Sequence, residues 1–270
     1  MACTAQRAKN SKVAQGLGRA GMVCIGVVHV IVAYLAIQVA FGDSSQQADQ
    51  KGAVSEIGSS PFGQVVLWVL AVGLVAYGGW QLMMAAVGLR WITKSGKRTR
   101  RRIGAVAKAA IGISLGLYAA RQAIGDDSSG SGDQQQQEFT AKLLALPAGQ
   151  VLVALAAAIV IGVGVAAVVK GVRKSFLDDL DLGDLPGGTQ RWVRGLGTFG
   201  YVAKGAVLGI VGVLLAFAAF RSNAKEAGGL DAALKTLAAQ PFGMAALIVV
   251  AVGLAAFGGY CFAAARAHKT

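Results

Sequence analysis

The sequence predicts an all-α polytopic membrane protein whose six transmembrane helices form three tandem helical hairpins. The first observation is composition: 55% of the 270 residues are apolar and 14% are charged, whereas a soluble chain carries about 25% charged residues. The second is a set of six apolar stretches of the length that a bilayer core requires, roughly 20 residues of helix. The third is an internal repeat. The six stretches are 21–41, 63–88, 103–124, 149–169, 199–220 and 243–265.

These stretches are expected to be helices because backbone groups in hydrocarbon must find their hydrogen-bond partners inside their own segment. The alternating pattern of a membrane β-barrel strand is absent.

The spans repeat in pairs. VLAVGLVAYGGW at 69–80 and VVAVGLAAFGGY at 249–260 are identical at eight of twelve positions, and each follows a Pro-Phe-Gly triplet. The middle copy keeps Pro147-Ala148-Gly149. We expect each proline in the first turn of its helix, where its missing N–H has no intrahelical partner. Two spans per copy give all copies one orientation, so the repeats are parallel, with a pseudo-symmetry axis along the membrane normal.

Polar segments connect the spans. Short amphipathic segments precede the prolines, around 52–57, 141–146 and 229–237, and the last of them is expected to lie along the outer membrane surface. The low-complexity tract 125–138 is expected to be a flexible outer loop. The predicted organisation is a basic tail (1–20), repeat 1 (21–88), a basic loop (89–102), repeat 2 (103–170), a second loop (171–198), repeat 3 (199–265) and a C-terminal tail (266–270).

This pattern resembles a known family. A glycine-rich first helix, a Gly-Ala-Leu-type segment, Pro-Phe-Gly and then AVGL-x-A-aromatic-Gly are similar to the bacterial membrane family catalogued as domain of unknown function 1206. The resemblance is close in repeats 1 and 3 and weak in repeat 2. It implies a bacterial cytoplasmic-membrane location and three paired-helix units, and it supplies no activity, cofactor or site residues.

Charge predicts the orientation. Eighteen of the 26 Lys and Arg residues lie in the two tails and in the second and fourth of the five loops between spans. Nine of the 13 acids lie in the other three loops, which are predicted to face outward. Both termini are therefore expected in the cytoplasm. The net charge of +13 follows this topology, so nucleic-acid binding is not supported. Anionic lipid head groups are the expected partners of the basic side. The candidate lipid-phosphate contacts are Lys97, Arg98, Arg100, Arg101, Arg102, Lys108 and Lys204.

A few polar residues fall inside the spans. His29 is the one histidine of a span, and it forms a candidate intramembrane polar site with Gln38, Gln81 and Arg121. Proton shuttling or metal ligation is one reading of His29, and a neutral histidine bonded to a neighbouring helix is the favoured one. Snorkelling to the interface is the favoured reading of the in-span lysines and of Arg121.

Glycines suggest where helices pack, because small residues let membrane helices approach closely. The predicted packing positions are Gly78, Gly79, Gly112, Gly116, Gly205, Gly209, Gly258 and Gly259. A cofactor or pore against bare backbone is the less favoured reading of the same residues.

No motif for phosphate binding, metalloprotease or serine-hydrolase chemistry occurs in the sequence. No acid lies in a span, which weakens carboxylate-driven transport. We therefore expect a protein that is not an enzyme and holds no cofactor, acting as a structural or accessory subunit of a larger membrane complex. A small-solute or ion transporter or channel is the alternative, and an anionic-lipid-binding protein is the second alternative.

Overall fold

The computed structural model describes residues 12–42, 47–88, 95–125, 131–180 and 187–267. Six long helices carry the apolar stretches, and each is long and apolar enough to cross a membrane. This confirms the predicted fold class. The six helices are α2 (Lys12–Ala40), α4 (Gly63–Met83), α5 (Ser95–Ala123), α7 (Gly149–Val172), α8 (Gly187–Phe220) and α10 (Gly243–Ala267).

Three of these helices, α2, α5 and α8, begin well before their apolar stretches, in segments predicted as tail or loop. Helix α5 begins at Ser95 and α8 at Gly187, although loops were predicted to continue to 102 and 198. Lys and Arg are good helix formers, so the basic flank SGKRTRRR prolongs α5. A π-helix, η1 (Met84–Gly88), follows α4, and a 3₁₀ turn, η2 (Ser175–Asp179), follows α7.

Short helices precede α4, α7 and α10, as the amphipathic pattern predicts. They are α3 (Gln50–Gly58), α6 (Gly132–Leu144) and α9 (Leu230–Ala238), the last following a 3₁₀ turn, η3 (Ala224–Glu226). The flexible loop predicted for 125–138 is wrong from Gly132 onward, where α6 begins. Ser131 and Gln134 form a capping box that satisfies both backbone N–H groups and starts this helix.

The Pro-x-Gly triplets form the same corner three times. The N–H groups of Gly63, Gly149 and Gly243 donate to carbonyls three residues earlier, at 2.8, 2.8 and 2.7 Å. The proline therefore occupies the second position of a β-turn, which its fixed φ favours, and its predicted place in the first helical turn is wrong. A side chain at these glycines would collide with carbonyl groups near the end of the preceding short helix.

The chain divides into two compact units, which are described separately. Unit 1 comprises 1–25, 54–127 and 261–270, and therefore contains α4 and α5. Unit 2 comprises 26–53 and 128–260, and contains α6 to α9 with most of α10 and the second half of α2.

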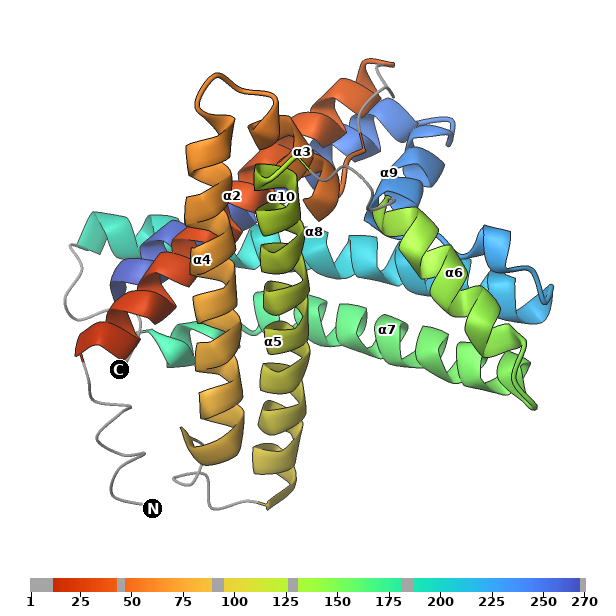
Figure 1. The fold of residues 1–270 in the computed structure, drawn as a ribbon, viewed down its shortest axis with the longest axis horizontal. Helices are drawn as coiled ribbons and strands as arrows, with labels where there is room; N and C mark the ends of the chain where they lie inside the picture. The colour runs from red at the N-terminus through yellow and green to blue at the C-terminus, as the bar shows by residue number, and fades with distance from the viewer. Residues whose placement is uncertain (1–11, 43–46, 89–94, 126–130, 181–186, 268–270) are drawn as a thin grey trace. The chain divides into compact units, whose positions relative to one another are not determined.

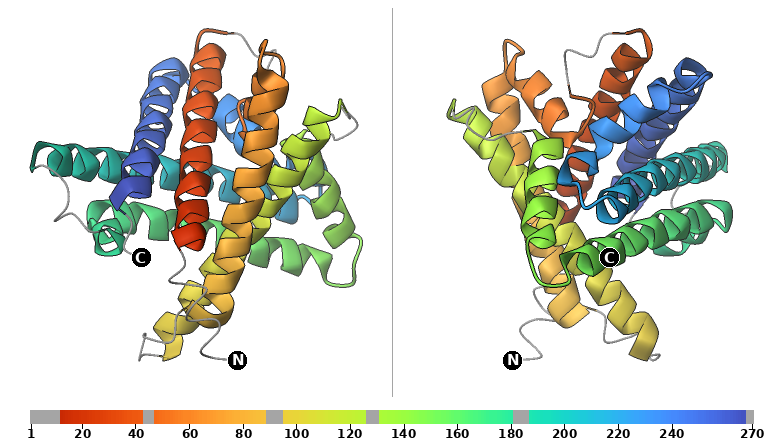
Figure 2. Two further views of the ribbon diagram at one scale, coloured as in Figure 1. Left: turned by 60° about the vertical axis from the view of Figure 1, so that its left-hand side comes forward. Right: turned by 90° about the vertical axis from the view of Figure 1, so that its right-hand side faces the viewer.

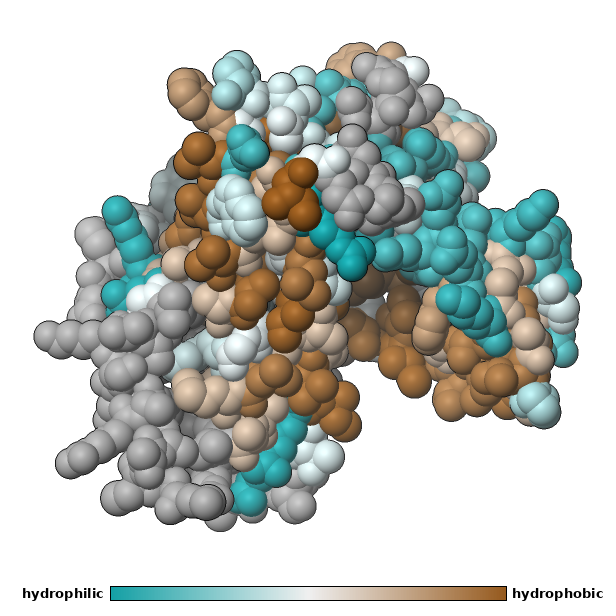
Figure 3. Space-filling model, in the orientation of Figure 1, coloured by the Kyte–Doolittle hydropathy of each residue, from teal (hydrophilic) through white to brown (hydrophobic). Residues whose placement is uncertain are grey.

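In unit 1, α4 and α5 lie side by side (Figure 1). A Cβ added to Gly78 of α4 would lie 3.0 Å from the Ala109 carbonyl oxygen of α5, and one added to Gly116 of α5 would lie 3.0 Å from that of Ala71. Large apolar side chains on the remaining faces stay exposed, as Figure 3 shows over α4 and α5. This is the pattern of helices that pack through small residues and face lipid elsewhere.

In unit 2, α7 lies along α8 (Figure 1), and α10 lies beside α2 (Figure 2). A Cβ on Gly164 of α7 would lie 2.8 Å from the Gly205 carbonyl oxygen of α8. One on Gly258 of α10 would lie 2.8 Å from the Gly26 carbonyl oxygen of α2.

These contacts are one contact repeated three times. Gly78, Gly164 and Gly258 occupy the same position of the repeat, and so do their partners at 109, 205 and 26. In each case the second helix of one repeat packs against the first helix of the next repeat, with the third repeat returning to the first. The glycine at this position sets how closely the two backbones approach.

Candidate functional site

The four predicted intramembrane polar residues fall in different units. His29 and Gln38 belong to unit 2, whereas Gln81 and Arg121 belong to unit 1. His29 is buried with its ring 4.8 Å from that of Phe257, and Arg121 is exposed. That the four residues form a single site stays a prediction.

The two glutamines share a local arrangement that the sequence reading missed. Gln38 Nε2 donates to the Tyr34 hydroxyl at 2.9 Å, and Gln81 Nε2 donates to the Tyr77 hydroxyl at 2.8 Å. Both pairs are spaced i, i+4, which places the side chains on one helix face. Within the described residues, Gln38 Oε1 is buried without a hydrogen-bond partner.

The basic residues predicted to contact lipid phosphate differ in their burial and in their neighbours. Arg102 Nη2 approaches the Ala86 carbonyl oxygen of η1 at 3.5 Å, Arg98 is half-buried, and Lys108 is exposed on α5. The side chains of Lys97, Arg100 and Arg101 lie outside the described residues. Lys204 differs from Lys108, its counterpart in repeat 2, because its ammonium lies 4.3 Å from the centroid of the Phe257 ring.

That ring belongs to an aromatic cluster in unit 2, formed by Phe176, Tyr201, Phe257 and Tyr260. Neighbouring ring centroids are 5.2 to 6.0 Å apart, most of them in edge-to-face or tilted geometry, which suits the aromatic quadrupole. Phe176 of η2 is fully buried, and a Cβ on Gly197 of α8 would collide with its ring. Gly197 therefore leaves room for the Phe176 ring.

The remaining packing glycines divide into two groups. Gly112 faces the Leu74 carbonyl oxygen at 3.2 Å, and Gly259 faces the Leu196 side chain at 3.4 Å, both distances measured from an added Cβ. An added Cβ on Gly79 or Gly209 would meet no atom within 4 Å. The backbone N of Gly209 nevertheless lies 3.1 Å from the Cβ position of Gly164, so it takes part in the α7–α8 contact as bare backbone.

A second feature that the sequence reading missed is the aspartate cluster: Asp49, Asp133 and Asp231, one carboxylate from each repeat, all in unit 2. Asp133 accepts hydrogen bonds from the backbone N–H groups of Gly229 and Ala232 at 2.7 and 2.9 Å, at the start of α9. Asp231 accepts one from Ala48 at 2.9 Å, just before α3. Each therefore binds the beginning of another repeat's surface helix, where free N–H groups favour an anion.

Asp49 completes this arrangement. Its carboxylate accepts the N–H of Gly52 at 2.7 Å and lies against Gly132, the first residue of α6, where an added Cβ would collide with Oδ2. The order of contact is repeat 1 to 2, 2 to 3 and 3 to 1, the same order as in the glycine contacts. The sequence signal available for this cluster was an aspartate at or beside the start of each amphipathic segment.

Burial raises the pKa of two aspartates of this cluster, Asp49 and Asp133. Asp49 and Asp231 are 4% and 6% exposed. Burial raises the pKa of Asp49, and the nearby charges of Asp133 and Asp231 raise that pKa further. Burial also raises the pKa of Asp133, and Asp231 adds to the effect. Lys235 Nζ lies 2.8 Å from Asp231 Oδ2. Among the described residues, no group of His, Cys, Asp and Glu is arranged to hold a metal ion.

Helix α7 presents a distinctive exposed face. It is the least buried of the six spans, because only 17% of its apolar 18-residue segment is buried. Ala154, Ala158 and Gly162 are exposed at i, i+4 and i+8 and form a small-residue ridge on this face. The first two positions hold larger residues in the other repeats: the exposed Trp68 and Val72 in repeat 1, and the half-buried Ile248 and the exposed Val252 in repeat 3.

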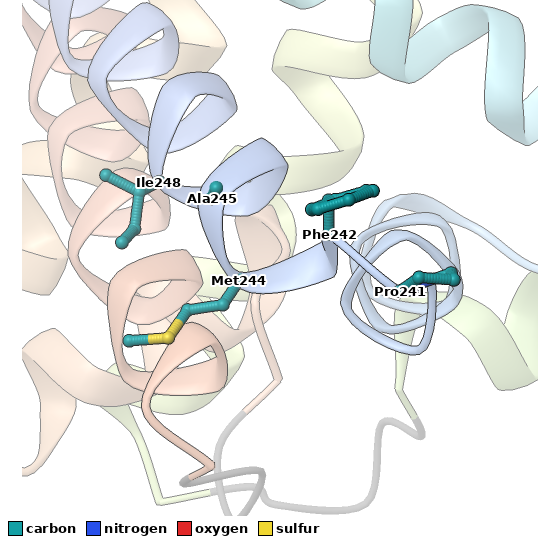
Figure 4. A pocket seen from close by; sticks show the side chains of 5 residues that line it. All are labelled: Pro241, Phe242, Met244, Ala245 and Ile248. Carbon is teal, nitrogen blue, oxygen red and sulfur yellow. The ribbon is translucent and has the colours of Figure 1, made fainter.

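An apolar hollow lies at the start of α10. Pro241, Phe242, Met244, Ala245 and Ile248 line it, all from the Pro-Phe-Gly corner and the first turns of the helix (Figure 4). Phe242 is 84% exposed and its counterpart Phe62 is 78% exposed.

Comparison with known proteins gives a family without an assigned activity. The model of the family described as Domain of Unknown Function (DUF1206) matches 20–88, 103–174 and 199–268, one match per repeat. An uncharacterized protein of Bacillus subtilis (strain 168), YxxB, is 29% identical over 243 residues, which cover 90% of this chain and 87% of that protein. No solved structure matches significantly. Because the three matches take up most of the chain and coincide with its three helix pairs, the protein belongs to the DUF1206 family.

Proposed function

We propose that this protein is a non-catalytic accessory subunit of a membrane complex, and that it binds its partner through the small-residue ridge of α7. It lies in the bacterial cytoplasmic membrane with both termini in the cytoplasm. The exposure of Ala154, Ala158 and Gly162 in mid-span is the observation that carries the proposal.

The physical argument rests on what packs against a membrane helix. Lipid tails fill the space beside a helix whatever the size of its side chains, whereas a partner helix gains contact when small residues let the backbones approach. The first two ridge positions hold large residues in repeats 1 and 3. Repeat 2 thus departs from the other copies in the direction that favours a helix partner.

The location and orientation rest on sequence and family. The excess of Lys and Arg in the tails and even-numbered loops supports cytoplasmic termini. The six spans carry no acidic residue, which supports a role in assembly over a carboxylate-driven transport cycle.

Co-purification tests the proposal. The native protein is extracted in a mild detergent beside the triple variant Ala154→Leu/Ala158→Leu/Gly162→Leu, with Ala206→Leu as a control at an exposed alanine of α8. We expect a partner in fixed ratio with the native protein and with the control, and loss of that partner from the triple variant at equal protein levels. A partner retained by the triple variant contradicts the role of the ridge.

A protein that purifies with no stoichiometric partner contradicts the accessory role. The transporter alternative then takes its place, and solute flux in liposomes distinguishes it. On the accessory proposal, His29→Ala leaves the phenotype intact, because His29 packs against Phe257 and is assigned no chemistry. Loss of function in this variant at normal protein levels would favour transport.

A further inference from the structure

Hydrogen bonds join the short helices of different repeats. Asp133, in the first turn of α6, accepts the N–H groups of Gly229 and Ala232 at the start of α9, at 2.7 and 2.9 Å. Asp231, in the first turn of α9, accepts the N–H of Ala48, just before α3, at 2.9 Å. Repeat 2 is thus tied to repeat 3, and repeat 3 to repeat 1, through residues that all belong to unit 2.

The contact of Asp49 closes the circle. Its carboxylate lies against Gly132, the first residue of α6, and so ties repeat 1 to repeat 2. The residue that receives each contact lies next to, or two residues from, the aspartate that makes the following contact. These neighbours are Ala48 and Asp49, Gly132 and Asp133, and Gly229 and Asp231. A shift of the backbone at one contact therefore moves the carboxylate of the next.

Burial makes a partly opened arrangement unfavourable. Asp49 and Asp231 are 4% and 6% exposed, and Ala48 is fully buried. If one contact opened alone, a buried carboxylate or a buried N–H group would lose its partner without gaining water, which is strongly destabilising. Lys235 stays beside Asp231 on the same helix, but an ammonium group cannot replace the acceptor of the Ala48 N–H. Opening all the contacts together admits water and avoids this cost.

We infer that α6, α9 and residues 47–53 at the start of α3 form a structural interlock, which opens as a single unit. The closed order of contacts, from repeat 1 to 2, from 2 to 3 and from 3 to 1, is the observation that carries the inference. Displacement of one short helix is transmitted to the other two repeats, so the interlock couples the three copies. This inference goes beyond the accessory role and does not depend on a protein partner.

Amide hydrogen exchange of the purified full-length protein in a mild detergent, resolved to single amides, tests the inference. The N–H of Ala48 is the reporter, because its acceptor is Asp231 and not Asp133. The test variant is Asp133→Ala, which removes two hydrogen bonds to the start of α9. The matched control is Gln137→Ala, which removes an exposed hydrogen bond from the same helix to the Lys225 carbonyl of repeat 3.

We expect Asp133→Ala to speed exchange at Ala48 about fivefold, although the substitution lies in another repeat, and to leave exchange in the middle of α8 unchanged. Gln137→Ala should leave Ala48 at the native rate, and Asp133→Asn, which retains an acceptor, should lie closer to the native rate. Acceleration confined to the start of α9 overturns the inference. Equal acceleration throughout α8 also overturns it, because the whole protein is then less stable.

The unmodified protein supplies an independent test. If the interlock opens as a single unit, the N–H groups of Ala48, Gly229 and Ala232 share one free energy of opening, because each of them is bound by an aspartate of the interlock. This common value should fall in parallel at the three amides as sodium dodecyl sulfate is added. Separate values at the three amides overturn the inference, even where Asp133→Ala does not fold.

Discussion

The glycine contact between consecutive repeats leads to a sharp prediction at Gly164. In Gly164→Ala, the new Cβ would lie 2.8 Å from the Gly205 carbonyl oxygen, 3.1 Å from the Gly209 nitrogen and 3.4 Å from Leu208 Cβ. Two of these three atoms are backbone atoms of α8, so no rotamer change relieves the contact, and α7 and α8 must separate.

The same helix offers a matched control. Gly162 lies two residues away, and a Cβ added there meets no atom within 4 Å. Replacing glycine with alanine in a helix stabilises it by roughly 0.5–1 kcal/mol, and this gain is common to both variants. Overpacking in a core costs about 1–3 kcal/mol. The difference between Gly164→Ala and Gly162→Ala should therefore be about 1–3 kcal/mol, with Gly164→Ala the less stable.

The assay is reversible unfolding of the purified protein in mixed micelles with increasing sodium dodecyl sulfate, followed by far-ultraviolet circular dichroism. We expect Gly162→Ala to unfold at or slightly above the native midpoint and Gly164→Ala clearly below it. Coincident midpoints for the two variants would refute the argument that this glycine sets the α7–α8 distance. Gly78→Ala beside Gly79→Ala repeats the comparison in unit 1, because only Gly78 faces a neighbouring backbone.

Three further predictions concern the aspartate and aromatic clusters. Because the pKa values of Asp49 and Asp133 are raised on folding, the folded state binds more protons than the unfolded state above about pH 4. The stability of the protein should therefore fall as pH rises from there towards neutrality. Asp49→Asn should flatten this pH dependence in thermal unfolding, and an unchanged slope contradicts the prediction. Asp133→Ala removes the N-terminal hydrogen bonds of α9 and should destabilise that helix by about 1 kcal/mol, which amide exchange in α9 detects as faster exchange. Asp133→Asn retains an acceptor and should exchange more slowly. Equal exchange in the two variants would contradict the role of Asp133 as a cap of α9. Phe176→Ala should lower the free energy of unfolding by about 3–5 kcal/mol in the micelle assay, because this ring is buried. Phe242→Ala removes an exposed ring and should lower it little. Similar losses in the two variants would contradict the argument from burial.

The candidate sites show how far sequence reasoning reaches. Lys108 and Lys204 have the same repeat position and were assigned the same snorkelling role, because hydropathy and depth do not distinguish them. The structure separates them: Lys108 is exposed, and Lys204 lies over the Phe257 ring. The difference comes from α10, which supplies that ring from 53 residues further along the chain, and no local pattern around Lys204 contains that information.

The aspartate cluster gives the same lesson in the surface helices. Asp49, Asp133 and Asp231 are predicted from the sequence only as acids of the outer loops, because they lie outside every apolar stretch. Their burial depends on contacts between repeats, such as Asp133 with the start of α9 across 96 residues. An acid near a helix start suggests a cap for its own helix, whereas two of these three acids bind the start of another repeat's helix.

The sequence by itself determined the six spans, the three copies and the Pro-x-Gly boundary before the second span of each copy. Each of these depends on residues within a few turns: hydrophobicity summed along a span, and a Pro-x-Gly triplet that bends the chain locally. Only the tertiary structure decided which helices touch. The second helix of each repeat packs on the first of the next because a missing Cβ at Gly78, Gly164 and Gly258 lets two backbones meet. Whether a glycine allows such a contact depends on which atoms of another helix lie beside it, and these are fixed only in the folded protein.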